Sequence, residues 1–190
     1  MKSALDIYNL VERFASGHKG EIVQTQTTFV EVDADFEPQS SASQNKIRIH
    51  FSGKREFSLR KGKFTSMHIF DDHPLLIDHI DSIASVHLAS AVGDKEKFRN
   101  GLETVANDIF CGWRSLESYL NMPLDVFLEK DYGILMFVPI TYAKAAVEMA
   151  EAIGVKLILR DLRKQEGNPR VIFFDERYVI ADDFRVQYLS

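Results

Sequence analysis

The first third of the chain changes from a helical to a strand period in its apolar positions. Over residues 3–15 the apolar residues recur every three or four positions and glycines follow, which predicts a helix. Between residues 21 and 70 the period falls to two. Such alternation is typical of strands with one buried and one exposed face. The glycines between the runs predict an antiparallel β-meander.

Helical spacing returns in the middle of the chain. The apolar residues at 76–91 fit one face of a helix, and Asp94 is a suitable N-cap for a second helix that Gly112 would end. A shorter third helix is expected before Pro123. The pattern therefore predicts a central segment of two to three helices.

The last third mixes both periods. An apolar strand is predicted at 133–138, an Ala-rich helix capped by Thr141 at 141–153, and a second strand at 155–160. In such a strand–helix–strand unit the two strands usually run parallel. Short antiparallel strands separated by polar turns are expected at 170–174, 177–181 and 184–189.

These elements together predict an α+β protein. It consists of an N-terminal helix, an antiparallel β-meander, a central segment of two to three helices, and a C-terminal strand–helix–strand unit followed by short antiparallel strands. We expect a single domain over residues 1–190, with a subdomain division near 121–132 as the alternative.

Composition narrows the classes of function. Of the 190 residues, 45% are apolar, and 23 Lys+Arg against 28 Asp+Glu give a net charge of −5. A disordered chain would hold fewer apolar residues, and a dedicated nucleic-acid binder would be basic. The single cysteine, Cys111, excludes an intramolecular disulfide and fits a reducing compartment. Because it follows a predicted helix C-terminus, we expect a buried structural thiol rather than a nucleophile.

The apolar runs of the chain bear on its location. Asp6 and Glu12 interrupt the N-terminal apolar stretch before it reaches the length of a signal peptide. The longest apolar run, residues 134–140, is far shorter than the ~20 residues that span a bilayer. We therefore expect a soluble, cytoplasmic protein that contacts no membrane.

Charge is distributed unevenly along the meander. Residues 46–63 hold seven Lys/Arg and one acid, a local charge of +6, whereas acids alternate along the preceding strand. If the two strands form a hairpin, opposite charges face one another and stabilise it by ~0.2–1 kcal/mol per pair. The expected facing pairs are Glu37 with Lys46, Asp35 with Arg48, and Asp33 with His50.

Part of the basic segment has no expected acidic partner. A basic sheet face with aromatic residues could bind phosphates, so weak nucleic-acid binding through turns 54–63 is an alternative. The basic residues at these turns are Lys54, Arg55, Arg60, Lys61 and Lys63.

An Asp/His-rich segment follows the meander. Its titratable residues are Asp71, Asp72, His73, Asp78, His79 and Asp81. Carboxylates and imidazoles can bind a metal or transfer protons, so Asp72, His73 and His79 are weak candidate catalytic residues. Their spacing matches no zinc motif, and we expect no metal and no cofactor. Helix caps and an exposed acidic face explain the segment better, with Asp71, Asp72, Asp78 and Asp81 as candidate binding residues.

Aromatic and cationic residues surround the expected break after the second central helix. Trp113, Arg114 and Tyr119 belong to the residue types that dominate binding hot spots, and they are candidate binding residues. A core tryptophan that fills the helix junction is the alternative. His87 falls on the apolar stripe, where a buried, hydrogen-bonded histidine is expected.

The combined pattern favours a binding protein over an enzyme. We predict a non-catalytic cytoplasmic module, comparable to inhibitors or immunity proteins, that binds another protein through acidic and aromatic surface. A metal-dependent hydrolase that uses the Asp72, His73 and His79 region is the alternative. The weak nucleic-acid binder described above is a second alternative.

Overall fold

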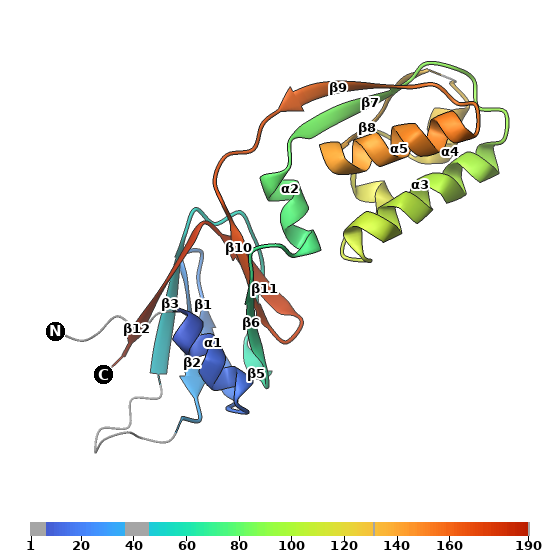
Figure 1. Ribbon diagram of the computed structural model, residues 1–190. Coiled ribbons are helices and arrows are strands. Elements are labelled where there is room, and N and C mark those ends of the chain that lie inside the picture. The colour runs from blue at the N-terminus through green and yellow to red at the C-terminus, as the bar shows by residue number, and fades with distance from the viewer. Residues whose placement is uncertain (1–6, 37–45, 131, 190) are drawn as a thin grey trace. The chain divides into compact units, whose positions relative to one another are not determined.

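The computed structural model describes residues 7–36, 46–130 and 132–189 (Figure 1). The described residues fall into two compact units. Unit 1 comprises the residues up to Leu76 and from Gly167 onward, and unit 2 comprises Ile77–Glu166. The segment 121–132, where the sequence offers a division, lies inside unit 2. Whether the chain folds as a single domain stays a prediction.

Unit 1 is built almost entirely from short antiparallel strands. Its sheets have the strand orders β12-β3-β2-β1-β5 and β4-β11-β10-β6. The elements are α1 (Ile7–Ala15), β1 (Gly20–Thr25), β2 (Phe29–Ala34), β3 (Lys46–Ser52), β4 (Glu56–Ser58), β5 (Gly62–Phe64), β6 (Met67–Phe70), the 3₁₀ helix η1 (Pro74–Leu76), β10 (Arg170–Phe174), β11 (Arg177–Ala181) and β12 (Asp183–Tyr188).

The two sheets of unit 1 form a closed circuit of pairings. β3 continues into β4, β5 into β6, and β11 into β12 after at most three residues. If each couple is counted as one bent strand, six strands pair in the order β1, β2, β3/β4, β12/β11, β10, β6/β5 and back to β1. The order of pairings therefore resembles that of a small β-barrel, although the strands are assigned to two sheets.

One apolar core joins both sheets and α1. Alternate residues of β2 and β3, such as Val32 and Ile49, are fully buried. The apolar face of α1 adds Leu10 and Phe14, and the ring of Phe14 lies 5.0 Å from that of Phe64. Burial of each such side chain contributes roughly 1.5–3 kcal/mol. The period of two that predicts the strands therefore also decides which side chains fill the barrel.

The register of the β2–β3 hairpin differs from the predicted one. Lys46 faces Asp33, and Arg48 faces Glu31, which accepts a hydrogen bond from Arg48 Nε at 3.0 Å. Lys46 and Arg48 each meet an acid four positions earlier than expected, because β2 ends before the acidic run does. The predicted pair of Asp33 with His50 is wrong, since His50 faces Phe29. The predicted partner of Lys46, Glu37, lies outside the described residues. A shift by an even number keeps every side chain on its face, so the pairing of opposite charges remains.

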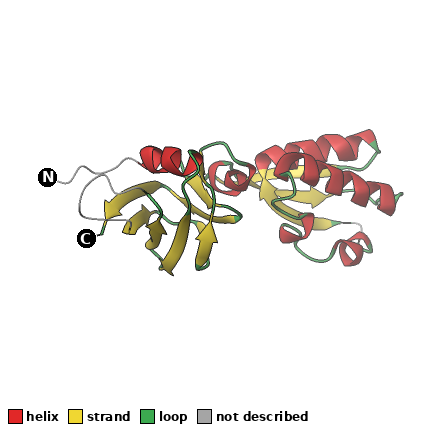
Figure 2. Ribbon diagram, turned by 90° about the horizontal axis from the view of Figure 1, so that it is seen from below, coloured by secondary structure: helices red, strands yellow, loops and turns green. Residues whose placement is uncertain are grey.

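Unit 2 combines a three-stranded sheet with two long helices. Its elements are α2 (Ile77–Ile80), β7 (Ile83–Leu88), α3 (Lys95–Phe110), the 3₁₀ helix η2 (Leu116–Ser118), α4 (Leu124–Leu128), β8 (Gly133–Pro139), α5 (Ile140–Ala152) and β9 (Leu157–Arg163). Helix α5 lies against all three strands, and α3 packs beside α5 (Figures 1 and 2).

The sheet of unit 2 has the order β8-β7-β9. Both outer strands pair antiparallel with β7, so they run parallel to each other, as expected of the strand–helix–strand unit. The residues that face the helices, such as Val86, are fully buried. The opposite face carries Ser85 and His87, together with the partly exposed side chains of Phe137 and Ile158.

The helix predicted over residues 76–91 is wrong. Apart from η1 and the single turn α2, this segment forms the central strand β7. Here both periods find support in the same segment: the helical stripe includes His87, but Ala84, Val86 and Leu88 also alternate with Ser85 and His87. Hydrogen bonding to β8 on one side and β9 on the other decides between them, and no local pattern contains that information.

The other two central helices are predicted with mixed success. Helix α3 confirms the second one, including its Asp94 N-cap. The third, expected before Pro123, is reduced to the 3₁₀ helix η2. A further helix that the sequence does not predict, α4, follows Pro123. The predicted class and element order nevertheless hold: an N-terminal helix, a meander, a central helical segment, a strand–helix–strand unit and short antiparallel strands in an α+β fold.

Candidate functional site

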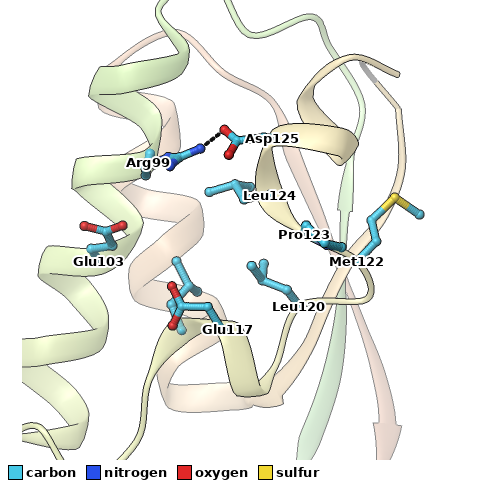
Figure 3. A pocket seen from close by; sticks show the side chains of 9 residues that line it. Arg99, Glu103, Glu117, Leu120, Met122, Pro123, Leu124 and Asp125 are labelled. Atoms are coloured by element: carbon cyan, nitrogen blue, oxygen red, sulfur yellow. Dashed lines mark hydrogen bonds and ion pairs between the residues drawn. The ribbon is translucent and has the colours of Figure 1, made fainter.

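Unit 2 contains a groove between α3 and α4, here named the α3–α4 groove (Figure 3). Its volume of about 390 Å³ lies within the usual range of small ligand sites. The lining side chains come from α3, η2 and the segment that leads into α4. They are Arg99, Glu103, Leu116, Glu117, Leu120, Met122, Pro123, Leu124 and Asp125.

The floor of the groove is apolar. Leu116 and Leu124 are buried, and Leu120 and Met122 are partly buried against the core of unit 2. Because these side chains already pack on one side, they are held in place and present a formed apolar surface to the groove.

The rim of the groove is acidic. Arg99 and Asp125 form an ion pair across one end, as the dashed line in Figure 3 marks, so their charges cancel. Glu103 on α3 and Glu117 on η2 are exposed, and no contact to either is recorded within the part of the chain that the structure describes. The groove therefore has a net charge of −2.

The net charge of the chain is concentrated in the unit that holds the groove. Residues 77–166 contain ten Lys/Arg and fourteen Asp/Glu, a net charge of −4. Unit 1 contains thirteen and fourteen, a net charge of −1. The field of unit 2 therefore favours the approach of cations.

Helix α3 forms one wall of the groove, and both of its ends are capped. Asp94 accepts a hydrogen bond from Lys97 N at 2.9 Å, and the helix ends at Cys111 in the left-handed conformation, with φ 51°. Cys111 is exposed, so the prediction of a buried thiol is wrong. The last buried residue of α3 is Phe110, and the left-handed turn begins directly after it.

The opposite wall is attached to the edge of the sheet. Asn121 N donates to Leu135 O at 2.9 Å, and Phe137 N donates to Tyr119 O at 3.1 Å. Leu120 forms an isolated antiparallel bridge with Met136. The segment between η2 and α4 thus follows β8 as a partial fourth strand, which fixes the floor of the groove.

Three of the predicted binding residues meet beside η2. Asp78 accepts from Arg114 Nε at 2.8 Å and from the Tyr119 hydroxyl at 2.7 Å. The side chains of Asp78 and Arg114 are 20% and 17% exposed. Burial, together with the hydrogen bond to Asp78, raises the pKa of Tyr119, so the hydroxyl remains a donor. This cluster ties η2 to α2.

Asp81 caps a helix that is distant in sequence. Its carboxylate accepts from Thr141 N at 2.8 Å, and Ile140 N donates to Ser82 O at 2.8 Å. Two free N–H groups at the start of α5 are thereby satisfied. The prediction that the Thr141 side chain caps this helix is wrong, because α5 begins one residue earlier and has no side-chain bond at its own N-cap.

The remaining Asp/His residues are divided between the units. Asp71 and Asp72 are exposed in unit 1 beside His73, whereas His79 is half-buried in unit 2. Burial lowers the pKa of His73 by more than the negative charge of Asp72 raises it. The Nδ1 atom of His73 accepts a hydrogen bond from Leu75 N at 3.2 Å. Within residues 7–36, 46–130 and 132–189, no group of three or more His, Cys, Asp or Glu could hold a metal ion.

Trp113 is 40% exposed and follows the end of α3. Among the three residues predicted around this break, it has the largest exposed apolar surface, since Tyr119 stacks on Phe110 at 5.0 Å. His87 is half-buried, not fully buried, and its Nε2 lies 3.0 Å from Ser85 Oγ.

The basic turns of unit 1 are partly engaged within the unit. Arg55 binds Asp182 through Nε at 2.9 Å, and the Lys54 ammonium lies 4.2 Å from the centre of the Phe57 ring. The side chains of the other three basic turn residues are exposed. These are Arg60, Lys61 and Lys63.

The sequence does not predict the most heavily bonded side chains of unit 1. Arg177 is nearly buried and donates to the carbonyl oxygens of Arg60 at 3.2 Å, Gly62 at 3.0 Å and Lys63 at 2.6 Å. It thereby holds the turn before β5 against the β10–β11 turn. A buried arginine in a polar turn resembles an exposed one in sequence, so no signal identifies it.

Asp175 holds the adjoining turn. It has φ 54° and accepts from the backbone N and the hydroxyl of both Thr65 and Ser66. Partial burial alone would raise the pKa of Asp175, but these hydrogen bonds lower it below its ordinary value. Asp175 and Arg177 therefore fix the bent strand β5/β6.

Comparison with family models, with curated proteins and with solved structures finds no match for this chain. No helix of the described residues has the length and apolarity that a membrane span requires.

Proposed function

We propose that this protein is a non-catalytic protein-binding or regulatory module and that its contact surface is centred on the α3–α4 groove. The observation that carries the proposal is the combination of an apolar floor with the carboxylates of Glu103 and Glu117 in the more acidic unit. An apolar centre with a charged rim is the usual composition of a specific protein interface.

The chemistry of the rim makes another protein the expected partner. A nucleic acid would bring its phosphates against a unit with a net charge of −4, and the Arg55 side chain is already bound to Asp182. The candidate catalytic residue His73 is partly buried and accepts a hydrogen bond from Leu75 N, which a structural role explains without a substrate. A cytoplasmic location, suggested by the single cysteine, is part of this proposal.

Affinity capture from native lysate with mass spectrometry tests the proposal. The wild-type chain is compared with E103Q/E117Q, in which both rim charges are removed. The matched control is E148Q/E151Q, which removes two exposed charges from α5 in the same unit, outside the groove. We expect a stoichiometric protein partner that the wild type and the control retain and the rim variant loses. Recovery of no partner, or equal recovery by all three, would overturn the proposal.

A further inference from the structure

The α3–α4 groove has a shape and charge that favour one kind of side chain. We infer that it takes an arginine of the partner protein, presented beside an apolar side chain on a linear segment. This inference rests on the proposed function and specifies the chemistry of the partner.

The floor selects an occupant with an apolar body. Leu116, Leu120 and Leu124 come from η2, the following segment and α4, and all three line the groove. Figure 3 shows Leu120 and Leu124 among the apolar side chains around it. An arginine side chain has an aliphatic stem that packs on such a surface while its head group remains at the rim. A small hydrophilic cation would leave this surface uncovered.

The rim selects a positive head group. Glu103 and Glu117 approach the groove from different elements, α3 and η2, and both are exposed to solvent. A guanidinium is planar and presents five donors, so it can bind more than one carboxylate oxygen at once. Lysine offers a single compact charge, and we expect it to bind more weakly than arginine.

The ion pair at the end of the groove limits its length. Arg99 and Asp125 join α3 to the start of α4, and the Asp125 side chain is 78% exposed. An exposed ion pair contributes only ~0–1 kcal/mol. Displacing so weak an ion pair costs little free energy. An apolar side chain next to the bound arginine can therefore contact Leu124 and Pro123 at this end of the groove.

A second copy of the chain is a less suitable occupant. Its unit 2 has the same net charge of −4, so contact between two copies of unit 2 would oppose like charges. A second copy could still offer its exposed basic turn at Arg60 and Lys61. Self-association through this turn is therefore one outcome of the test.

Fluorescence anisotropy with defined peptides tests the inference on the full chain. The probe is a blocked, labelled heptapeptide with one central arginine between two leucines, and glutamine elsewhere. In the control peptides lysine, glutamine or glutamate replaces the arginine. We expect binding in the order arginine, lysine, glutamine, with none for glutamate, and an affinity that decreases as salt is added.

The protein variants locate the site. We expect E103Q/E117Q to weaken the arginine peptide by at least tenfold and E148Q/E151Q to leave its affinity unchanged. The variant L120Q tests the floor, and its melting temperature shows whether it is folded. Equal affinities for E103Q/E117Q and E148Q/E151Q, or binding of the glutamate peptide as strong as that of the arginine peptide, would overturn the inference.

The outcomes separate this inference from the proposed function. If a lysate partner is lost by E103Q/E117Q while no arginine peptide binds, the binding function stands and the chemistry assigned to the partner is wrong. If sedimentation velocity of the chain alone shows self-association that both E103Q/E117Q and R60Q/K61Q abolish, a second copy is the occupant and the inference is overturned.

Discussion

Units 1 and 2 use their charged side chains in different ways. In unit 1, Arg48, Arg55 and Arg177 bind acids or carbonyl groups of the same unit, and the net charge is −1. In unit 2, Asp78 and Asp81 are engaged internally, whereas Glu103 and Glu117 face a groove. The net charge there is −4.

The two units also differ in how their sheets end. The strands of unit 1 close into a circuit of pairings. The three strands of unit 2 do not close, and the segment after η2 follows β8 for only a few residues before it turns into α4. Residues of that incomplete strand line the groove. The irregular sheet edge beside β8 leaves an open groove, whereas the circuit of unit 1 is filled by its apolar core.

The largest expected effect lies in the barrel, at Arg177. Truncation in R177A removes the donors for four carbonyl groups, and we expect a loss of about 3 kcal/mol of stability. Thermal unfolding measures it. The control R185A truncates an arginine of the same unit that is 83% exposed, and it should cost less than about 0.5 kcal/mol. Equal effects of the two variants would contradict the internal role of the unit 1 cations.

The second effect tests whether Asp78 is a structural or a free carboxylate. D78A removes the carboxylate that accepts from Arg114 Nε and from the Tyr119 hydroxyl, so we expect a loss of about 2 kcal/mol. A double-mutant cycle with Y119F measures the coupling. If D78A destabilises the protein no more than a typical surface substitution does, Asp78 is a carboxylate available for binding and not an internal one.

The third effect is a pH dependence in unit 1. The pKa of Asp175 in the folded state lies below its ordinary value, so its contribution to stability is present above about pH 4 and disappears as the pH falls through the folded-state pKa. We expect D175N to cost about 1–2 kcal/mol at pH 7. The free energy of unfolding of D175N should then fall less than that of the wild type between pH 4 and pH 2. Parallel curves for the two proteins would contradict the assigned hydrogen bonds.

The smallest effect concerns the helix cap that Asp81 supplies to α5. D81A should cost about 1 kcal/mol, typical of a lost N-cap, and D81N less. Chemical denaturation at two salt concentrations measures both. If T141A destabilises the chain more than D81A does, the local cap predicted from the sequence would be correct after all.

Sequence periodicity predicts most of the fold because one face of each strand is buried. Val30, Val32, Ile47 and Ile49 alternate with charged residues, and the structure buries all four. The same reasoning fails at β7, where a helical and a strand period coincide. It also misses the hairpin register, because the length of a loop is not encoded in the alternation of the strands beside it.

The candidate site is much harder to predict. The Asp78, Arg114 and Tyr119 side chains come together as an internal cluster, which explains three of the predicted binding residues in structural terms. Glu103 and Glu117 are absent from the predicted set, because an exposed acid beside a groove and an exposed acid on an open helix face have the same local sequence. Only the packing of η2 and α4 beside α3 distinguishes them.

We propose that the binding surface lies at the groove of unit 2 and not on the basic turns of unit 1. Hydrogen exchange of the full chain, measured with and without the captured partner, tests it most directly. We predict new protection within residues 95–128 and unchanged exchange within residues 46–63. Protection of residues 46–63 without any change around the groove would contradict the account.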